Sequence, residues 1–330
     1  MLAIVILNYN GRKHLEQFLP SVVKYSSPYQ IIIADNASTD DSVQFLQTVY
    51  PEIKLIINQK NEGFAGGYNT ALKQIQAKYF LLLNSDVEVS PNWVEPLLKL
   101  MENNKQIAAC QPKIRSFLQK EYFEYAGAGG GMIDYLGYPF CRGRIFDTCE
   151  LDNGQYDDSR EVFWATGACI LVRADIFTQL GGFDADFFAH MEEIDLCWRM
   201  KNAGYQIHYC AESTVFHLGG GTLNKSNPFK TYLNYRNGLA LLAKNLPSNK
   251  LFTIIFSRLV LDGVSGVKLF LGGNFADVWA IIKAHFAFYA WLPSLMKKRK
   301  SINPQEVSEV YPNSIVWQYF AKGKKKYSEL

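Results

Sequence analysis

The first 115 residues alternate short apolar runs with stretches of helical periodicity, and this alternation constrains the fold more than any other feature of the sequence. Five runs have the length and composition of buried strands, at residues 3–7, 30–34, 54–57, 79–83 and 107–111. Four helical segments lie between them, at residues 14–25, 41–49, 68–77 and 93–101. Strands that alternate with helices in this way form parallel sheets covered by helices on both faces. The sequence therefore predicts an α/β fold with a Rossmann-like, mostly parallel central sheet.

The alternation is lost after this segment. Residues 116–160 are rich in Gly, Tyr, Asp and Arg, and we expect an irregular insertion with short strands that forms a flap over the site. Strand-like runs return at residues 168–172 and 206–210, on either side of a helical pattern near 194–202. Beyond residue 232 the chain looks helical to about residue 296. We therefore expect a large domain at residues 1–245, with halves at 1–115 and 116–245, and then a C-terminal helical region with a basic tail at 246–330.

Charge and cysteine usage narrow the class of protein. The chain carries 34 Lys and Arg against 31 Asp and Glu, and residues 297–330 alone hold eight of the basic and three of the acidic residues. Because the basic excess lies in this tail, we expect no nucleic-acid binding by the rest of the chain. No apolar run reaches the about 18 residues of a membrane-spanning helix, and the apolar start reads as a buried strand rather than a signal peptide. The six widely spaced cysteines are expected to be free thiols of a cytoplasmic protein.

Polar residues gather where the predicted strands end. Each of the first four strands is followed by a polar cluster, at residues 8–11, 35–40, 61–69 and 84–86. Right-handed crossovers bring the carboxyl ends of parallel strands to one edge, where open α/β sheets bind ligands. A dinucleotide-binding site would need G-x-G-x-x-G after the first strand, but only Gly11 is present, and no Walker A loop occurs. The edge is therefore predicted to bind a ligand other than a nicotinamide dinucleotide.

The cluster Asn84-Ser85-Asp86 suggests a degenerate D-x-D motif, in which a carboxylate at a strand end holds Mg²⁺ or Mn²⁺ and the metal bridges a diphosphate. By itself this cluster is better explained as a turn. The second half adds Gly181-Gly182-Phe183-Asp184, then FFAHMEEIDLCWR at residues 187–199, then His217 followed by LGGGT. This ordered set resembles the family-2 glycosyltransferases with the GT-A fold, in particular their bacterial rhamnosyltransferase-like branch, over residues 2–245.

The resemblance implies an enzyme that inverts the anomeric carbon of a nucleotide-diphospho-sugar, with UDP- and dTDP-sugars favoured. By family position, Asp35 would contact the base or ribose of the nucleotide, and the backbone around Asn8 and Tyr9 would form a wall of its pocket. Trp164 would lie near the donor sugar or the acceptor, with ordinary core packing as the alternative. Further residues implied to contact the donor are Asn61, Gly63, Gly66, Asn69, Ser85 and Asp86.

A divalent cation, Mn²⁺ or Mg²⁺, is also implied by the resemblance. Asp86 holds the last position of the D-x-D-like motif and would ligate the metal, although Asn84 occupies the first position. His217, before the glycine run, is the second candidate ligand. Arg236 would neutralise phosphate, or would simply pair with a surface carboxylate.

The catalytic base is expected in the acidic cluster. Relatives often carry Glu-Asp where this chain has Glu192-Glu193, so Glu193 takes the position of the base. If a helix begins here, Glu192 and Asp195 share a face, and either is then an alternative base or positions it. Acids favoured by the dipole at a helix N-terminus are the further alternative.

The expected acceptor is a hydroxyl group of a growing cell-surface polysaccharide or lipid-linked glycan. The aromatic stretch at residues 284–296, followed by a basic cluster, suits the anionic cytoplasmic face of the inner membrane, or else forms a helical subdomain that packs on the core or on a second copy. Two other functions remain open at this point: a non-catalytic sugar-nucleotide-binding protein of the same fold, and a nucleotidyltransferase.

Overall fold

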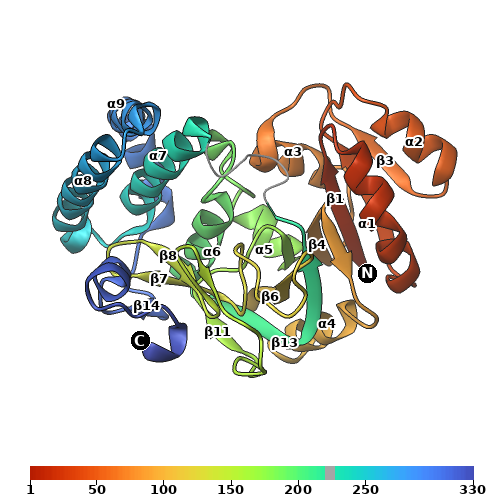
Figure 1. Cartoon of the computed structure of the whole chain (residues 1–330). Helices are drawn as coiled ribbons and strands as arrows, with labels where there is room; N and C mark the ends of the chain where they lie inside the picture. The colour runs from red at the N-terminus through yellow and green to blue at the C-terminus, as the bar shows by residue number, and fades with distance from the viewer. Residues whose placement is uncertain (220–226) are drawn as a thin grey trace.

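A nine-stranded sheet forms the centre of the molecule in the computed structural model, which describes residues 1–219 and 227–330 (Figure 1). Its strand order is β11-β13-β6-β12-β4-β1-β2-β3, and β5 pairs with β13 beside this path. The strands are β1 (Leu2–Asn8), β2 (Gln30–Asp35), β3 (Lys54–Ile57), β4 (Tyr79–Asn84), β5 (Val87–Val89), β6 (Ile107–Ser116), β11 (Arg160–Val162), β12 (Cys169–Arg173) and β13 (Gln206–His217).

The strand directions confirm the expected mostly parallel sheet. β3, β2, β1 and β4 pair in parallel, and β12 runs antiparallel to both of its neighbours, β4 and β6. β6 therefore has the same direction as β4, and β13 pairs with β6 in parallel. The exceptions in this sheet are β5, β11 and β12.

Hydrophobic side chains on both faces of the sheet explain why its first strands are continuous apolar runs. In β1, Leu2, Ile4 and Ile6 point into one core with α1 and α4, whereas Ala3 and Val5 point into the other core with α3. A strand buried on both faces needs apolar residues at every position. The helices of this part are α1 (Arg12–Tyr25), α2 (Ser42–Val49), α3 (Gly63–Leu72), α4 (Val94–Asn103), α5 (Ala174–Gln179) and α6 (Glu192–Asn202).

The third helix differs from the expected boundaries. The sequence predicted a loop of glycines and then a helix over residues 68–77, but α3 begins at Gly63 and ends at Leu72. Glycine disfavours helices by about 1 kcal/mol relative to alanine, so a run of glycines reads as a loop. Here close packing decides instead, because a Cβ atom on Gly67 would lie 2.9 Å from the side-chain nitrogen of Asn36. The short strand β5 was also missed by the sequence reading.

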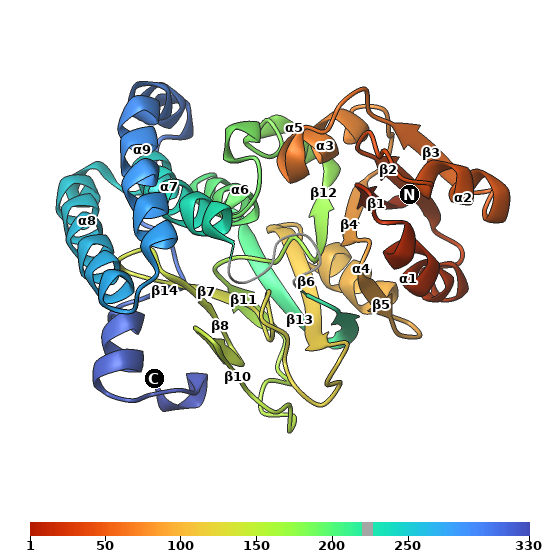
Figure 2. The same cartoon turned by 45° about the horizontal axis from the view of Figure 1, so that its top comes forward.

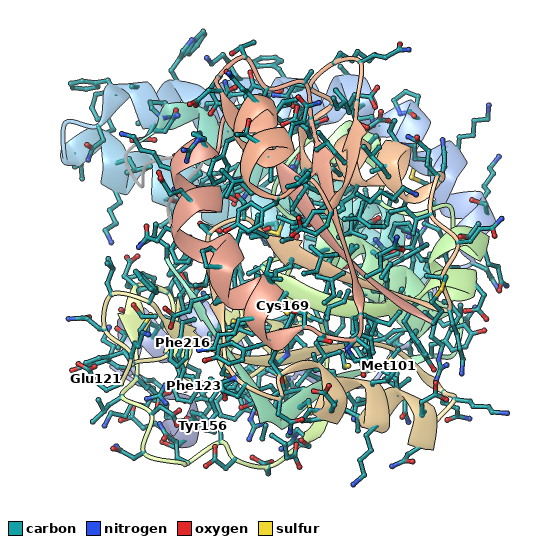
Figure 3. All side chains as sticks on the ribbon, turned by 90° about the vertical axis from the view of Figure 1, so that its right-hand side faces the viewer. Met101, Glu121, Phe123, Tyr156, Cys169 and Phe216 are labelled. Carbon is teal, nitrogen blue, oxygen red and sulfur yellow. The ribbon has the colours of Figure 1, made fainter. Side chains whose placement is uncertain are left out.

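The insertion forms a second sheet, with the order β10-β9-β8-β7-β14. Phe123 and Tyr156, whose ring centroids are 5.5 Å apart, lie in its core (Figure 3). The short strands expected in this region are thus confirmed, while its role as a flap stays a prediction. The strands are β7 (Gly131–Asp134), β8 (Pro139–Cys141), β9 (Arg144–Ile145), β10 (Thr148–Cys149) and, from the C-terminal tail, β14 (Val310–Tyr311).

Three helices follow the sheet and confirm the C-terminal helical extension: α7 (Pro228–Asn245), α8 (Ser248–Leu271) and α9 (Phe275–Ile302). They lie opposite the N-terminal α/β half of the molecule (Figure 1). Within the described residues, no helix combines the length and the apolar character that crossing a membrane would require. Three short helical segments complete the fold. One lies before α6, at Ala185–Phe187 (η1), and two lie in the C-terminal tail, at Trp317–Ala321 (η2) and Tyr327–Glu329 (η3). The expected division at residue 245 stays a prediction.

Candidate active site

Three side chains from distant parts of the chain meet at the carboxyl ends of β4 and β13. Asp86 lies in the turn between β4 and β5, and His217 is the last residue of β13. The Nε2 atom of His217 is 3.2 Å from Oδ1 of Asp86, and its Nδ1 atom is 3.1 Å from Oε2 of Glu124. The pairing of β5 with β13 sets this geometry, because it places Val87 opposite His217. The expected proximity of Asp86 and His217 is therefore observed.

The charges of this cluster depend on each other. His217 is buried, which by itself lowers its pKa, but the carboxylates of Asp86 and Glu124 outweigh this effect and raise the pKa to about 10. Although burial works in the opposite direction, His217 in turn holds the pKa of each carboxyl below its usual value. Two carboxylates thus face one imidazolium. An ion could bind His217 only after the proton on Nε2 leaves, and the two carboxylates would then favour a cation in its place.

The donor set fits a divalent cation. Two neighbouring ligands of an octahedral ion with bonds of about 2.1 Å lie about 3 Å apart, which is close to the separation of Nε2 and Oδ1 here. Glu124 accepts a hydrogen bond from Nδ1, as second-shell carboxylates of metal-bound histidines do. Among residues 1–219 and 227–330, no group of three or more His, Cys, Asp or Glu side chains is arranged to hold a metal. An ion held by Asp86 and His217 would therefore need further ligands beyond those that the described residues provide.

Sequence reasoning missed Glu124. It lies in the irregular insertion, 93 residues before His217, and no motif or spacing connects the two. Gly219 leaves room for it, because a Cβ atom there would lie 2.5 Å from Oε1 of Glu124. The other glycines of this motif, Gly220 and Gly221, lie outside the described residues.

The polar ends of β1 and β2 bind each other, as their predicted convergence requires. Asn8 pairs with Asp35 in the parallel register, and its side-chain nitrogen donates hydrogen bonds to Asp35 (2.9 Å) and to Ser38 (3.1 Å). The second Asp35 oxygen accepts from the backbone N–H of Ser38. Asp35 and Asn8 are both 0% exposed and hold the loop in place, while their contact with a nucleotide stays a prediction. Tyr9, in contrast, is exposed beside them.

A second network joins β2 to the start of α3. The side-chain nitrogen of Asn36 donates to Asn61 (2.9 Å) and to the carbonyl oxygen of Gly63 (3.0 Å), and its oxygen accepts from Asn58. Asn61 lies at the exposed end of this network. Asn69 points elsewhere, because its side chain binds both the N–H and the carbonyl group of Phe183. Of these residues, Asn61 retains the position of a ligand contact.

The glycines of α3 do not lie open to a ligand. A Cβ atom on Gly63, whose φ is +70°, would lie 2.6 Å from the carbonyl oxygen of Phe188. A Cβ atom on Gly66 would lie 2.6 Å from Cβ of Glu62. Both glycines therefore permit close packing within the chain, and Gly63 brings the first turn of α3 against the loop that precedes α6.

This loop before α6 holds three residues with left-handed backbone conformations. Phe188, His190 and Met191 have φ angles of 66°, 67° and 73°. Each such conformation costs about 1–3 kcal/mol outside glycine, and such residues concentrate at functional sites. The loop ends in Glu192, the first residue of α6.

Asn237 of α7 stabilises the loop. It is fully buried, and its side-chain nitrogen donates to the carbonyl oxygens of Phe187, Ala189 and His190 at 3.1, 2.9 and 2.8 Å. The neighbouring Arg236 donates to the carbonyl oxygens of residues 186 and 187 rather than to a surface carboxylate, and its role toward phosphate stays a prediction. Sequence reasoning missed Asn237 because only the fold brings α7 to this loop.

Replacement of Asn237 by alanine is expected to lower the free energy of unfolding by about 1–3 kcal/mol, because buried carbonyl groups lose their donor. Urea denaturation of both proteins measures the difference. Asn274→Ala, at an exposed position before α9, is the matched control and is expected to change stability little. Equal stability of the two variants would contradict the role given to Asn237.

The two adjacent acids differ in burial. Glu192 is 4% exposed, whereas Glu193 is half-buried. Burial, together with the charge of Glu193, raises the pKa of Glu192 well above its usual value. Burial also raises the pKa of Glu193. The Oε2 atom of each has no hydrogen-bond partner among the described residues. Both acids therefore bind a proton more strongly than a free glutamate does.

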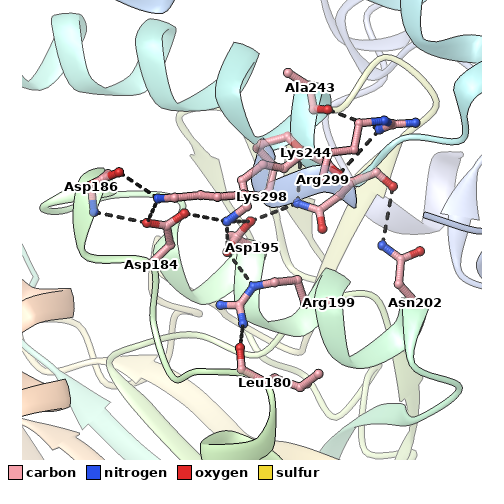
Figure 4. A network of polar contacts seen from close by, with 12 residues as sticks. Leu180, Asp184, Asp186, Asp195, Arg199, Asn202, Ala243, Lys244, Lys298 and Arg299 are labelled. Atoms are coloured by element: carbon pink, nitrogen blue, oxygen red, sulfur yellow. Dashed lines mark hydrogen bonds and ion pairs between the residues drawn. The ribbon is translucent and has the colours of Figure 1, made fainter. Parts of the chain in front are cut away.

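Asp195 has a different environment (Figure 4). It is 0% exposed, and its carboxylate accepts hydrogen bonds from Arg199 (2.8 Å), Lys244 (2.9 Å) and Asn245 (2.9 Å). Although burial opposes it, the charges of Lys244 and Arg199 lower the pKa of Asp195 to about 2. A carboxylate so fully engaged is a poor proton acceptor, so its position supports a structural role that joins α6 to α7.

The remaining site candidates lie as follows. Trp164 is 4% exposed, packs on Gly131 and donates its indole N–H to the carbonyl oxygen of Met132, which places it in the core. Ser85, between Asn84 and Asp86, is half-buried at the sheet edge. A cavity of about 370 Å³ opens beside the first turns of α7 and is lined by Pro228, Phe229, Tyr232 and Lys283.

Comparison with known proteins agrees with this architecture. The family described as glycosyl transferase family 2 matches residues 3–180. An N-acetylglucosaminyl-diphospho-decaprenol L-rhamnosyltransferase of Mycobacterium tuberculosis is 29% identical over 236 residues, which cover 66% of this chain and 76% of that protein. Rhamnosyltransferase WbbL of Escherichia coli is 25% identical over 225 residues, which cover 66% of this chain and 83% of that protein.

Among solved structures, GalNAc-T7 with UDP, GalNAc and Mn²⁺ superposes with a TM-score of 0.60 at 15% identity, over 98% of this chain and 56% of that one. This likeness concerns the fold, and it agrees with the GT-A architecture that the sequence predicted. The family match extends over more than half of the chain, from β1 to the end of α5. The chain therefore belongs to glycosyl transferase family 2, as a glycosyltransferase similar to bacterial rhamnosyltransferases.

Proposed function

We propose that this protein transfers a hexose, with rhamnose as the leading candidate, from a nucleotide-diphospho-sugar to an acceptor hydroxyl group, with inversion at the anomeric carbon. The observation that carries the proposal is the pair formed by Asp86 and His217 at the carboxyl edge of the sheet, with Glu124 behind it. The names of the two relatives support rhamnose as the sugar.

The donor would bind at this edge. Asp86 and His217 would hold Mn²⁺ or Mg²⁺, and the diphosphate of the donor would provide further ligands. When bound, the ion would neutralise the charge that develops on the leaving diphosphate. Tyr9 and Asn61 are exposed near the nucleotide end of the site, whereas the buried Asp35 and Asn8 would keep the loop in shape. The structure of GalNAc-T7 contains UDP and Mn²⁺, which supports this choice of ligands.

Glu193 would act as the general base. It would accept the proton of the acceptor hydroxyl while the hydroxyl oxygen attacks the anomeric carbon and the bond to the diphosphate breaks. One such displacement inverts the configuration. A raised pKa suits this role, because a base works best when its pKa is near the working pH.

The acceptor would enter by the cavity beside α7. Phe229 and Tyr232 stack with their centroids 6.0 Å apart, and Phe188, five residues before Glu193, contacts Phe229. Aromatic rings and the Lys283 ammonium suit a sugar carried on a phosphate-linked lipid. The name of the mycobacterial relative supports such an acceptor. We infer that the enzyme works at the cytoplasmic face of the membrane that holds this lipid.

Thermal unfolding with UDP, dTDP, GDP and NAD, each with and without Mn²⁺, tests the donor site. A ligand at a hundred times its Kd stabilises the folded state by about 2.7 kcal/mol, so one nucleoside diphosphate is expected to raise Tm in the presence of metal. Asp86→Ala is expected to abolish the metal-dependent part of the shift. Glu306→Ala, in an exposed pair with Lys250, is the control and should keep it.

Other outcomes would overturn the proposal. A shift with NAD alone would place the protein in a different class. Binding of the diphosphate without any transfer or donor hydrolysis would favour a non-catalytic binding protein, and consumption of a nucleoside triphosphate with a sugar phosphate would favour a nucleotidyltransferase. The anomeric configuration of the product, determined by NMR, tests inversion directly.

A further inference from the structure

The helices α8 and α9 expose an unusual number of large apolar side chains. The exposed fractions of Phe252, Trp279 and Phe286 are 83%, 59% and 72%. Phe256, Phe275 and Tyr289 are exposed as well. We call the exposed sides of these two helices the outer face. Soluble domains rarely leave an apolar surface of this extent uncovered, and larger patches mark binding surfaces.

The pattern of each helix shows that this exposure is built into the sequence. α8 buries Ile254, Arg258 and Asp262 at intervals of four residues. Its exposed apolar residues fall outside this buried stripe, at positions 252, 256, 260, 264, 267, 270 and 271. In α9, the exposed residues 275, 279, 282, 286 and 289 follow steps of four and three, which trace one stripe of a helix. The buried stripe of α9, with Ala280, Ala284 and Phe288, faces the rest of the protein. The outer face is therefore a second apolar stripe, not the core side of an ordinary amphipathic helix.

The charges on the outer face have a single sign. Residues 251–300 contain two acidic residues, and neither is free at the surface. Asp262 is 1% exposed and accepts a hydrogen bond from His285, and half-buried Asp277 accepts one from Thr231. Residues 251–300 expose four lysines, at positions 268, 283, 297 and 300. A partner of this face must therefore tolerate both aromatic rings and uncompensated positive charge.

The C-terminal tail continues the outer face near the connection between α8 and α9 (Figure 2). The ammonium group of Lys268 lies 4.8 Å from the ring centroid of Phe320 in η2. Phe320 and Trp317 are exposed, at 56% and 63%, and exposed lysines follow them at positions 322, 325 and 326. The tail thus adds aromatic and cationic groups of the same kind next to the tip of α8.

We propose that the outer face of α8 and α9 binds the surface of an anionic lipid bilayer, with its aromatic rings among the acyl chains and its lysines at the phosphates. Aromatic and basic side chains on exposed helices are the pattern of interfacial membrane binding. A second copy of the chain fits less well, because a two-fold interface would set this cationic face against itself. Lys283 also lines the cavity beside α7, so membrane binding through the outer face would place that cavity at the lipid surface. Only the connection between this cavity and a lipid-linked acceptor rests on the proposed function.

Flotation of the full chain with vesicles tests the proposal. Vesicles of phosphatidylcholine with phosphatidylglycerol are expected to carry the protein, and vesicles of phosphatidylcholine alone to carry much less. Because each lysine near an anionic surface strengthens binding by about fivefold, Lys→Gln at positions 268, 283, 297 and 300 should weaken it by at least about tenfold. Lys→Gln at the exposed positions 13, 54, 99 and 105 of the N-terminal half is the matched control and should leave it unchanged. Lys298 stays unaltered because it binds Asp184.

A second variant tests the aromatic part. Phe252→Ser, Trp279→Ser and Phe286→Ser together are expected to lower binding to anionic vesicles by at least tenfold while the thermal unfolding temperature stays near that of the parent. Failure of the parent to float with either vesicle would overturn the proposal. A dimer in solution that the serine variant dissociates would also overturn it and would assign the face to a second copy. Flotation needs neither donor nor activity, so its failure is distinct from failure of the proposed function.

Discussion

Glu193→Gln is expected to lower kcat by about 10²- to 10⁴-fold, which is the usual contribution of a general base. The substitution keeps the size of the side chain and removes its ability to accept a proton. Glu193 is the less buried member of the acid pair, and its Oε2 atom has no partner among the described residues. The KM for the donor and the metal-dependent rise of Tm should change little, because the diphosphate would bind at Asp86 and His217. Steady-state kinetics of the purified variant measures the effect.

Glu192→Gln is the matched control for this result. Glu192 is more deeply buried, and burial together with the charge of Glu193 raises its pKa well above the usual value, which favours its protonated form. An amide in its place resembles the neutral acid, and kcat is expected to fall much less than in the Glu193 variant. If Glu192→Gln were the more damaging change, the base would be Glu192, the alternative that the sequence left open.

The pH dependence of kcat gives an independent check on Glu193. Burial raises the pKa of this carboxyl, and the base works only when ionised. Activity is therefore expected to rise with pH through a range above the usual pKa of glutamate. A rate that is already constant at the ordinary pKa of a free carboxyl would contradict the assignment.

Asp195→Ala is expected to destabilise the folded protein by roughly 3–5 kcal/mol, as the removal of one partner from a buried ion pair does. The side chain of Lys244 is 2% exposed and that of Arg199 is 8% exposed, so both charges would lose a carboxylate that water does not replace. Lys244 and Lys298 share Asp184, which connects α9 to the same network (Figure 4). Urea denaturation followed by circular dichroism measures the change.

Asp186→Ala is the matched control within this network. Its carboxylate also binds Lys298, but it is 54% exposed, and exposed ion pairs contribute about 0–1 kcal/mol. A small effect is therefore expected, and equal effects of the two variants would contradict the importance of burial. The pH dependence has a definite sign. The pKa of Asp195 is lowered to about 2 from 3.8, so its contribution is complete above about pH 4 and is lost as the pH falls toward 2.

The sequence by itself determined the architecture and indicated which polar residues would gather at one edge of the sheet. The apolar runs of the first 115 residues required strands buried on both faces, and the intervening helices required parallel connections. Polar residues at the strand ends then had to meet at one edge, which is why Asp86 and Asn8 could be placed in advance. The pairing of Asp86 with His217 followed from the ordered motifs and is observed in the structure.

The tertiary structure alone decided which of these polar residues are exposed and which are buried and hydrogen-bonded within the chain. Asp35 and Trp164 fit the family pattern, yet both are buried and occupied within the chain, and Asn69 binds the backbone of Phe183. The spacing of residues along a chain shows which side chains are present, but it does not show how deeply each of them is buried after packing. Burial and the number of hydrogen-bond partners decide whether a carboxylate is free to accept a proton or is held by its neighbours, as the half-buried Glu193 and the fully buried Asp195 illustrate.

The same reason explains the residues that the sequence could not reveal. Glu124 acts on His217 from the insertion, and Asn237 acts on the loop before α6 from α7, across 93 and at least 47 residues. No local periodicity or cap signals such contacts, because they depend on how the insertion and α7 pack against the sheet. Sequence therefore determined the strands, the helices and the edge where they end, whereas long-range packing determined the charges and the shape of the site.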